Sequence, residues 1–227
     1  MHLLLLGLLV LALLFGPQLW ARYTLQRHSK PRPDFPGSGG QLARHLLDRY
    51  RLDHVQVEST DHGDHYDPLS KTVRLSPHIF DGRSLTAVAV AAHEVGHALQ
   101  DHSGYAPLAW RGRLVELAQR AEKAGSAIMM ILPVVALISR SPAAGGAVFL
   151  LGLTTMAIST VVHLITLPVE LDASFGRALP ILTQGEYIEK KDERAARAIL
   201  RACALTYVAG SLASLLNLWR WLRLWRR

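Results

Sequence analysis

The sequence predicts a mainly α-helical integral membrane protein with a small β element and about four transmembrane helices. Of its 227 residues, 50% are hydrophobic and only 19% are charged, and the apolar residues are gathered into long blocks. Average soluble domains contain about 25% charged residues. The composition, with a mean hydropathy of +0.17, therefore favours a chain that contacts lipid.

Four apolar blocks are the candidates for membrane spans. Leu3–Trp20 carries no charge and is close to the shortest length that crosses a hydrocarbon core of about 30 Å. Gly125–Ser139 is short, whereas Ala147–Leu167 and Ala198–Trp219 are long enough to span. These blocks divide the chain into an anchor (1–21), a polar region (22–123), a transmembrane hairpin (124–168), a further helical region (169–198) and a last transmembrane helix with a basic tail (199–227).

The first block is predicted to remain as an uncleaved membrane anchor. A cleaved signal peptide is the alternative, but the block lacks a basic start. Leu19, at the −3 position of a cut after Ala21, also makes a poor cleavage site. The polar region would then begin on the far side of the membrane from the N-terminus.

The polar region is predicted to start as a small α+β element. Lys30–Gly40, rich in Pro and Gly, is interpreted as a linker, and Gln41–Arg51 as an amphipathic helix. Val55–Glu58 and Lys71–Leu75 alternate like short strands on either side of the Asp61–Pro68 turn. Four histidines lie in or beside this segment: His54, His62, His65 and His78. A second metal site is one interpretation of them, and a solvated turn is the default.

The motif His93-Glu94-Val-Gly-His97 lies inside a predicted helix. Ser84 can cap that helix, and Leu85–Gln100 is an unbroken run dominated by helix-forming residues. Residues four apart share a helix face, so both imidazoles can bind one Zn²⁺, while Glu94, about 100° round the helix, reaches a water at the metal. A lone buried histidine is usually a satisfied core residue, but this cluster would be costly to bury without a metal. The motif predicts a zincin-like catalytic core over residues 22–123, with Glu94 as general base.

A third metal ligand must come from elsewhere in the chain, because catalytic zinc takes three protein ligands and leaves one position for water. The metzincin arrangement would require Gly at position 100 and His at position 103, and this chain has Gln100 and Ser103. A distant Glu or His is therefore needed. The best candidate is Glu170, just beyond an apolar block in a helical pattern that Pro168 is suited to begin.

Three polar residues follow Glu170 closely. Asp172 and Ser174 lie near enough in sequence to orient a ligating histidine or carboxylate. Arg177 could stabilise an oxyanion, and the alternative is a structural ion pair with Asp172 or Asp101.

Four segments together resemble the YugP-type neutral zinc metallopeptidases of bacterial membranes: DHYDPLSKTVRLS, AAHEVGHALQ, SGYAPLAWR and LPVELDASFGRAL. The likeness covers nearly the whole chain. In that family, and in the similar HtpX-type membrane proteases, the metal ligands are the two histidines of the motif and a glutamate downstream of a hydrophobic hairpin. The resemblance implies His93, His97 and Glu170 as zinc ligands and Glu94 as general base. In the HtpX-type pattern an aspartate stands where this chain has Ser174.

The blocks Gly125–Ser139 and Ala147–Leu167 are predicted to form a helical hairpin around Arg140–Gly146. Two crossings return the chain to its starting side, so Glu170 can meet the two histidines in one site. If the first block were only a re-entrant segment, Glu170 would lie on the opposite side.

A peptidase of this type needs a surface that aligns its substrate. An exposed strand beside the metal commonly pairs with the substrate backbone. We expect Val73–Ser76 to be that edge, with Val73 in contact with the substrate.

The net charge of +7 does not indicate nucleic-acid binding. The basic residues gather at the ends of the predicted spans, for example over residues 22–32 and 220–227, and Trp219, Trp221 and Trp225 fit an interfacial aromatic belt. We expect the partners to be the lipid bilayer and a protein or peptide substrate, with no signal for an oligomeric state. The distribution of Arg and Lys favours a multi-pass protein of the bacterial inner membrane with a cytoplasmic catalytic side, although the C-terminal basic cluster argues the reverse.

Two functions are compatible with these features. The first is a membrane-embedded zinc-dependent endopeptidase in which Glu94 activates a zinc-bound water. The second is a catalytically inactive zinc-binding membrane scaffold. The presence of Glu94 favours the peptidase.

Overall fold

The computed structural model describes residues 2–206 of the chain. Within them the chain forms two compact units, the first made of residues 2–18 and 110–167 and the second of residues 19–109 and 168–206. All the residues singled out for the candidate metal site lie in the second unit.

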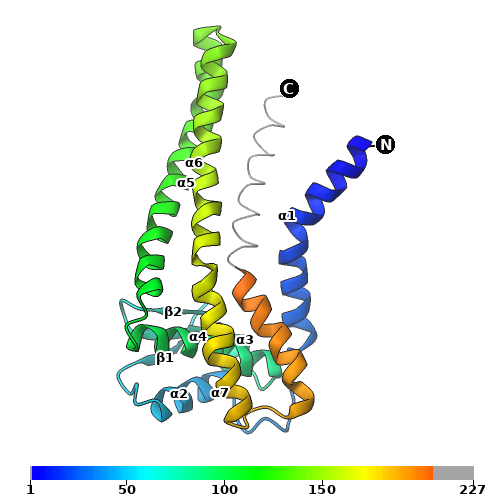
Figure 1. Cartoon of the computed structure of the whole chain (residues 1–227), viewed down its shortest axis with the longest axis vertical. Helices are drawn as coiled ribbons and strands as arrows, with labels where there is room; N and C mark the ends of the chain where they lie inside the picture. Colours follow the sequence, from blue (N-terminus) through cyan, green and yellow to red (C-terminus); the bar gives the residue numbers. More distant parts are fainter. Residues whose placement is uncertain (1, 207–227) are drawn as a thin grey trace. The chain divides into compact units, whose positions relative to one another are not determined.

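The first unit is helical. It contains the start of α1 (His2–Arg27) and most of α5 (Ala106–Ser139) and α6 (Pro142–Leu171), the long helices coloured green to yellow in Figure 1. α5 and α6 are connected through Arg140, whose φ of 46° is in the left-handed region. The helices on both sides of residues 140–146 were predicted, and the turn is shorter than the sequence suggested, because α6 begins at Pro142.

The prediction of about four transmembrane helices is wrong. Within residues 2–206, no helix combines the length and the apolar character needed to cross a membrane. Charge-free blocks had suggested the spans, and α5, which contains one of these blocks, also carries charged residues between Arg111 and Lys123. Most of the fourth predicted span, Ala198–Trp219, lies outside the described residues.

The second unit is built around α4 (Leu85–His102). The elements before α4 are α2 (Gly39–Arg49), β1 (Gln56–Ser59), β2 (His65–Asp67), β3 (Thr72–Leu75) and α3 (Pro77–Phe80). The elements after α6 are the π-helical segment η1 (Asp172–Ala178), α7 (Leu179–Gln184), the short 3₁₀ turn η2 (Lys190–Asp192) and a helix over residues 193–206.

The sheet has the strand order β1-β3-β2. β3 pairs in parallel with β1, Val57 opposite Val73, and antiparallel with β2, Tyr66 opposite Val73. The prediction of Val73–Ser76 as an exposed edge is therefore wrong, because β3 is the central strand and Val73 is fully buried. The sequence showed no third strand, because β2 has only three residues and lies inside the predicted turn. The free edges of the sheet belong to β1 and β2.

α4 begins at Leu85, as predicted. The Ser84 hydroxyl accepts a hydrogen bond from the Ala87 amide at 3.1 Å and caps the helix. The Thr86 hydroxyl donates to the Leu25 carbonyl oxygen at 2.8 Å, which fastens the end of α1 to the start of α4. Every residue of α4 from Leu85 to Ala98 is buried, so the motif lies in the interior of its unit.

The segment between α1 and α2 is packed against its unit, although its composition suggested a linker. Arg32 makes two hydrogen bonds of 2.8 Å to the carboxylate of Asp192, and its amide donates to the Arg83 carbonyl oxygen at 2.8 Å. Phe35 is only 5% exposed. The hydrogen bonds of Arg32 and the buried ring of Phe35 fix residues 30–38, which have no regular secondary structure.

Candidate metal centre

Three side chains predicted as metal ligands converge in the second unit. His93 and His97 extend from α4 and Glu170 from the end of α6, and all three are buried. Glu170 Oε2 lies 3.4 Å from His93 Nε2 and 3.3 Å from His97 Nε2. Within residues 2–206, this is the one group of three or more His, Cys, Asp or Glu side chains arranged to hold a metal ion.

The spacing of these atoms fits a zinc ion. Tetrahedral zinc with nitrogen and oxygen ligands at about 2.0–2.1 Å places neighbouring ligand atoms about 3.3–3.4 Å apart. Both histidine-to-Glu170 distances have this length. They are long for a charge-assisted hydrogen bond, which measures about 2.7–2.9 Å. The donor set of two imidazoles and a carboxylate is also one that catalytic zinc sites use.

His93 is oriented by Ser174 of η1. The Ser174 hydroxyl lies 3.0 Å from the Leu200 carbonyl oxygen, which can only accept, so the hydroxyl hydrogen is directed there. Ser174 Oγ is also 2.9 Å from His93 Nδ1, and it therefore accepts a hydrogen bond from that nitrogen. With its proton on Nδ1, His93 presents the lone pair of Nε2 toward Glu170.

His97 is oriented by Gln100, one turn further along α4. Gln100 Oε1 lies 2.9 Å from His97 Nδ1. The Gln100 amide nitrogen is 2.8 Å from both the Val169 carbonyl oxygen and Asp172 Oδ2. The two histidines therefore have separate partners on their Nδ1 atoms, and both Nε2 atoms face the same glutamate.

Glu170 stands where α6 changes into the π-helical segment η1. Hydrogen bonds in a π-helix span one residue more than in an α-helix, so the side chains that follow are shifted around the axis. In this segment Asp172 and Ser174 both contact residues of α4. Pro168, predicted to begin a new helix, lies inside α6. Pi-helical turns occur frequently at functional sites.

Asp172 contacts the centre through Gln100. Its Oδ2 also accepts a hydrogen bond from Arg177 Nε at 3.0 Å. Arg177 donates in addition to Ser103 Oγ at 3.2 Å and lies 5.8 Å from the centre of the Tyr105 ring. Of the two interpretations of Arg177, the structure favours the ion pair with Asp172.

Glu94 lies beside His93 in α4 and is 6% exposed. It is not part of the group of three candidate ligands. Burial raises the pKa of the nearby Cys203 thiol, and the carboxylates of Glu94, Asp64 and Glu170 raise it further. These three carboxylates are therefore within electrostatic reach of the same buried thiol. Asp64 immediately precedes β2, a strand that packs against α4.

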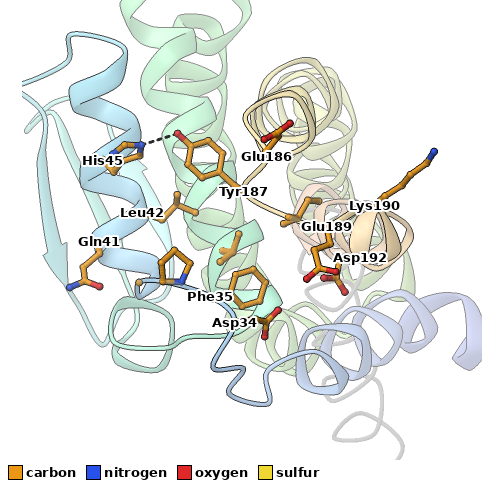
Figure 2. A pocket seen from close by; sticks show the side chains of 14 residues that line it. Asp34, Phe35, Gln41, Leu42, His45, Glu186, Tyr187, Glu189, Lys190 and Asp192 are labelled. Atoms are coloured by element: carbon orange, nitrogen blue, oxygen red, sulfur yellow. Dashed lines mark hydrogen bonds between the residues drawn. The ribbon is translucent and has the colours of Figure 1, made fainter.

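A cavity of about 740 Å³ in the same unit lies away from the candidate ligands. Figure 2 shows His45 of α2 and Tyr187 of the loop after α7 meeting in this cavity, where the ring nitrogen and the hydroxyl are 2.9 Å apart. Phe35 and Val88 are among the apolar residues that line the cavity. None of the three candidate ligands lines it.

Sequence reasoning missed two residues of the centre. Gln100 was considered only because it excludes the metzincin arrangement, although a polar side chain three residues after His97 lies on the same helix face and was a usable signal. Gly96 faces the backbone of Ala173 in η1. No local pattern reveals that contact, because it joins segments far apart in the chain.

The chain is similar to known proteins over nearly its whole length. Residues 3–226 match a family described as “Putative neutral zinc metallopeptidase”. The chain is 37% identical over 214 residues to “Putative membrane protease YugP” of Bacillus subtilis (strain 168), covering 92% of this chain and 90% of the relative. No solved structure matches the chain. The resemblance inferred from the four sequence segments is confirmed: the chain belongs to the family described as “Putative neutral zinc metallopeptidase”.

Proposed function

We propose that the chain is a zinc-dependent endopeptidase that hydrolyses peptide bonds with Glu94 as general base. The observation that carries the proposal is that both histidines converge on the Glu170 carboxylate. Glu170 Oε2 lies 3.4 Å from His93 Nε2 and 3.3 Å from His97 Nε2. Both imidazoles have Nδ1 engaged elsewhere. The three residues would hold one zinc ion and leave a position for water and substrate.

Bound zinc would polarise the scissile carbonyl and lower the pKa of a water molecule to about 7. Glu94 follows His93 directly and projects about 100° further round α4, beside the ligands and outside their group. In this position its carboxylate would take the proton of the attacking water and pass it to the leaving amine. Its burial excludes bulk water from competing for that proton.

The outer edge of β2 is our candidate for aligning the substrate. β2 is an edge strand that packs against α4, and Tyr66 of β2 donates a hydrogen bond of 2.6 Å to Asp101 of α4. An extended substrate added to that edge would pair through main-chain hydrogen bonds. Binding of an uncleaved peptide to Glu94→Gln should slow amide exchange in residues 65–67, and unchanged exchange there would exclude this edge.

We further propose that the protein acts at a membrane. The relative from Bacillus subtilis is named a membrane protease, and α5 exposes apolar side chains such as Leu137 and Ile138, each 77% exposed. The full chain should sediment with membranes after cell breakage. Recovery of the folded protein in the supernatant would contradict this part of the proposal.

The inactive-scaffold alternative is separated from the peptidase by one experiment. The purified protein is stripped with a chelator, reloaded with zinc and incubated with a peptide library. The peptidase predicts cleavage that is lost on stripping and regained on reloading. A zinc-loaded protein with no turnover on any peptide would favour the scaffold.

A further inference from the structure

We propose that Gln100 is the positioning residue of the metal centre, because one carboxamide both fixes the tautomer of His97 and holds the segment that carries Glu170. This inference rests on the proposed zinc site and does not depend on peptide hydrolysis. Gln100 is fully buried and is not one of the three candidate ligands.

The orientation of the Gln100 amide follows from its partners. Gln100 is fully buried, and its terminal atoms have three hydrogen-bond contacts between 2.8 and 2.9 Å. The Val169 carbonyl oxygen and the Asp172 carboxylate are acceptors, so the NH₂ group must face them. The carbonyl oxygen is left for His97, whose Nδ1 must then donate.

This bond selects one form of the imidazole. A neutral histidine has its proton on Nδ1 or Nε2, and a donating Nδ1 leaves the lone pair on Nε2. Nε2 of His97 is the atom 3.3 Å from Glu170. Gln100 therefore holds His97 in the form that can bind a metal through the atom that faces the other ligands.

The other half of the amide acts on Glu170. Val169 immediately precedes this glutamate and Asp172 follows two residues later, so the two NH₂ contacts lie on either side of it. This is also the junction between α6 and η1, where the backbone leaves the α-helical pattern. A side chain from α4 thus fixes the position of the third ligand relative to the two histidines.

The side chain of Gln100 is matched to both tasks in length and chemistry. Glutamate would still accept from His97, but it has no hydrogen to donate to Val169 and would place a second carboxylate beside Asp172. Methionine has nearly the same length and neither group. The two replacements therefore separate the tautomer effect from the tether.

The test measures zinc affinity and the His97 tautomer in Gln100→Met, Gln100→Glu and the matched control Gln184→Met, which changes an exposed glutamine of α7. Affinity is measured by competition with a zinc chelator, and the tautomer by ¹⁵N NMR of histidine-labelled, metal-free protein. Circular dichroism and thermal unfolding show whether each variant is folded.

Loss of a residue that orients a ligand weakens metal binding by about 10–100-fold. We expect a loss of that size in Gln100→Met, together with loss of the pure Nδ1–H signal of His97. Gln100→Glu should keep the Nδ1–H signal and still bind zinc more weakly than wild type, and Gln184→Met should match wild type in both measurements.

Wild-type zinc affinity in folded Gln100→Met would overturn the proposal. Wild-type zinc affinity in Gln100→Glu would show that the hydrogen bonds from Gln100 to Val169 and Asp172 do not contribute to zinc binding. If Gln100→Met does not fold, the zinc affinity of Gln100→Glu still tests the contacts with Val169 and Asp172. The ¹⁵N spectrum of the metal-free wild type still tests the tautomer of His97. An Nε2–H signal for His97 in that spectrum would refute the assignment. Absence of peptidase activity would instead refute the proposed function and leave these results standing.

Discussion

A Cβ atom added to Gly96 would lie 2.7 Å from the carbonyl oxygen of Ala173, so α4 and η1 are as close as a glycine allows. Real Cβ atoms essentially never approach a neighbour within 3.0 Å. The neighbouring atom belongs to the backbone, which cannot rotate away as a side chain could. The glycine of the His-Glu-Val-Gly-His motif therefore sets the separation between the helix of the two histidines and the segment after Glu170.

Gly96→Ala should weaken both the fold and the metal site. Alanine favours a helix over glycine by about 1 kcal/mol, but forced overpacking typically costs about 1–3 kcal/mol. We expect a net loss of stability in thermal unfolding. Zinc affinity should fall as well, because η1 and Glu170 are displaced from His93 and His97.

Gly112→Ala is the matched control, since it also adds a methyl group to a helical glycine. Nothing lies within 4 Å of the added atom at that position. This variant should be as stable as wild type or slightly more stable. If Gly96→Ala behaved in the same way, the close contact with Ala173 would have no role in the site.

Ser174→Ala should lower zinc affinity by about 10–100-fold, because His93 loses the acceptor for its Nδ1–H. The buried groups that are left without a partner add a stability cost of about 1–3 kcal/mol. Chelator competition measures the first effect and thermal unfolding the second. Ser29→Ala, at an exposed serine, is the control. Unchanged zinc binding in Ser174→Ala would mean that His93 does not need this partner.

Glu170→Ala should reduce zinc occupancy far more than Asp172→Ala, because it removes a proposed ligand and Asp172 acts through Gln100. The expected loss for Asp172→Ala is at most about 100-fold. His102→Ala changes an exposed residue just beyond the motif and should have no effect. Metal analysis after purification ranks the three variants by their zinc content. Normal zinc content in Glu170→Ala would show that Glu170 is not the third zinc ligand.

The α4 helix and the meeting of its histidines with Glu170 could be anticipated from sequence, because both depend on strong signals. Ser84 and a run of apolar helix formers predicted the start of α4, and the helix begins at Leu85. The four-residue spacing of His93 and His97 predicted that they share one helix face. Glu170 followed from the number of ligands that zinc requires and from the family resemblance.

The remaining features depend on contacts that sequence patterns do not encode. A three-residue strand, β2, takes an edge position and makes β3 central, so Val73 is buried. The amino-acid composition of the π-helical turn after Glu170 does not distinguish it from an α-helix. This turn nevertheless places Asp172 and Ser174 against α4. The apolar blocks predicted membrane-spanning helices, and none of the described helices has the length and apolar character of such a span.

Peptide hydrolysis by Glu94→Gln is the most direct test of the proposed mechanism. Glutamine has nearly the same shape as glutamate and cannot act as a base, and position 94 is outside the group of candidate ligands. We expect a variant with wild-type zinc content and wild-type thermal stability whose hydrolysis rate is lower by about 10²–10⁴-fold or more. Substantial hydrolysis by the zinc-loaded variant would contradict the assignment of Glu94 and the mechanism built on it.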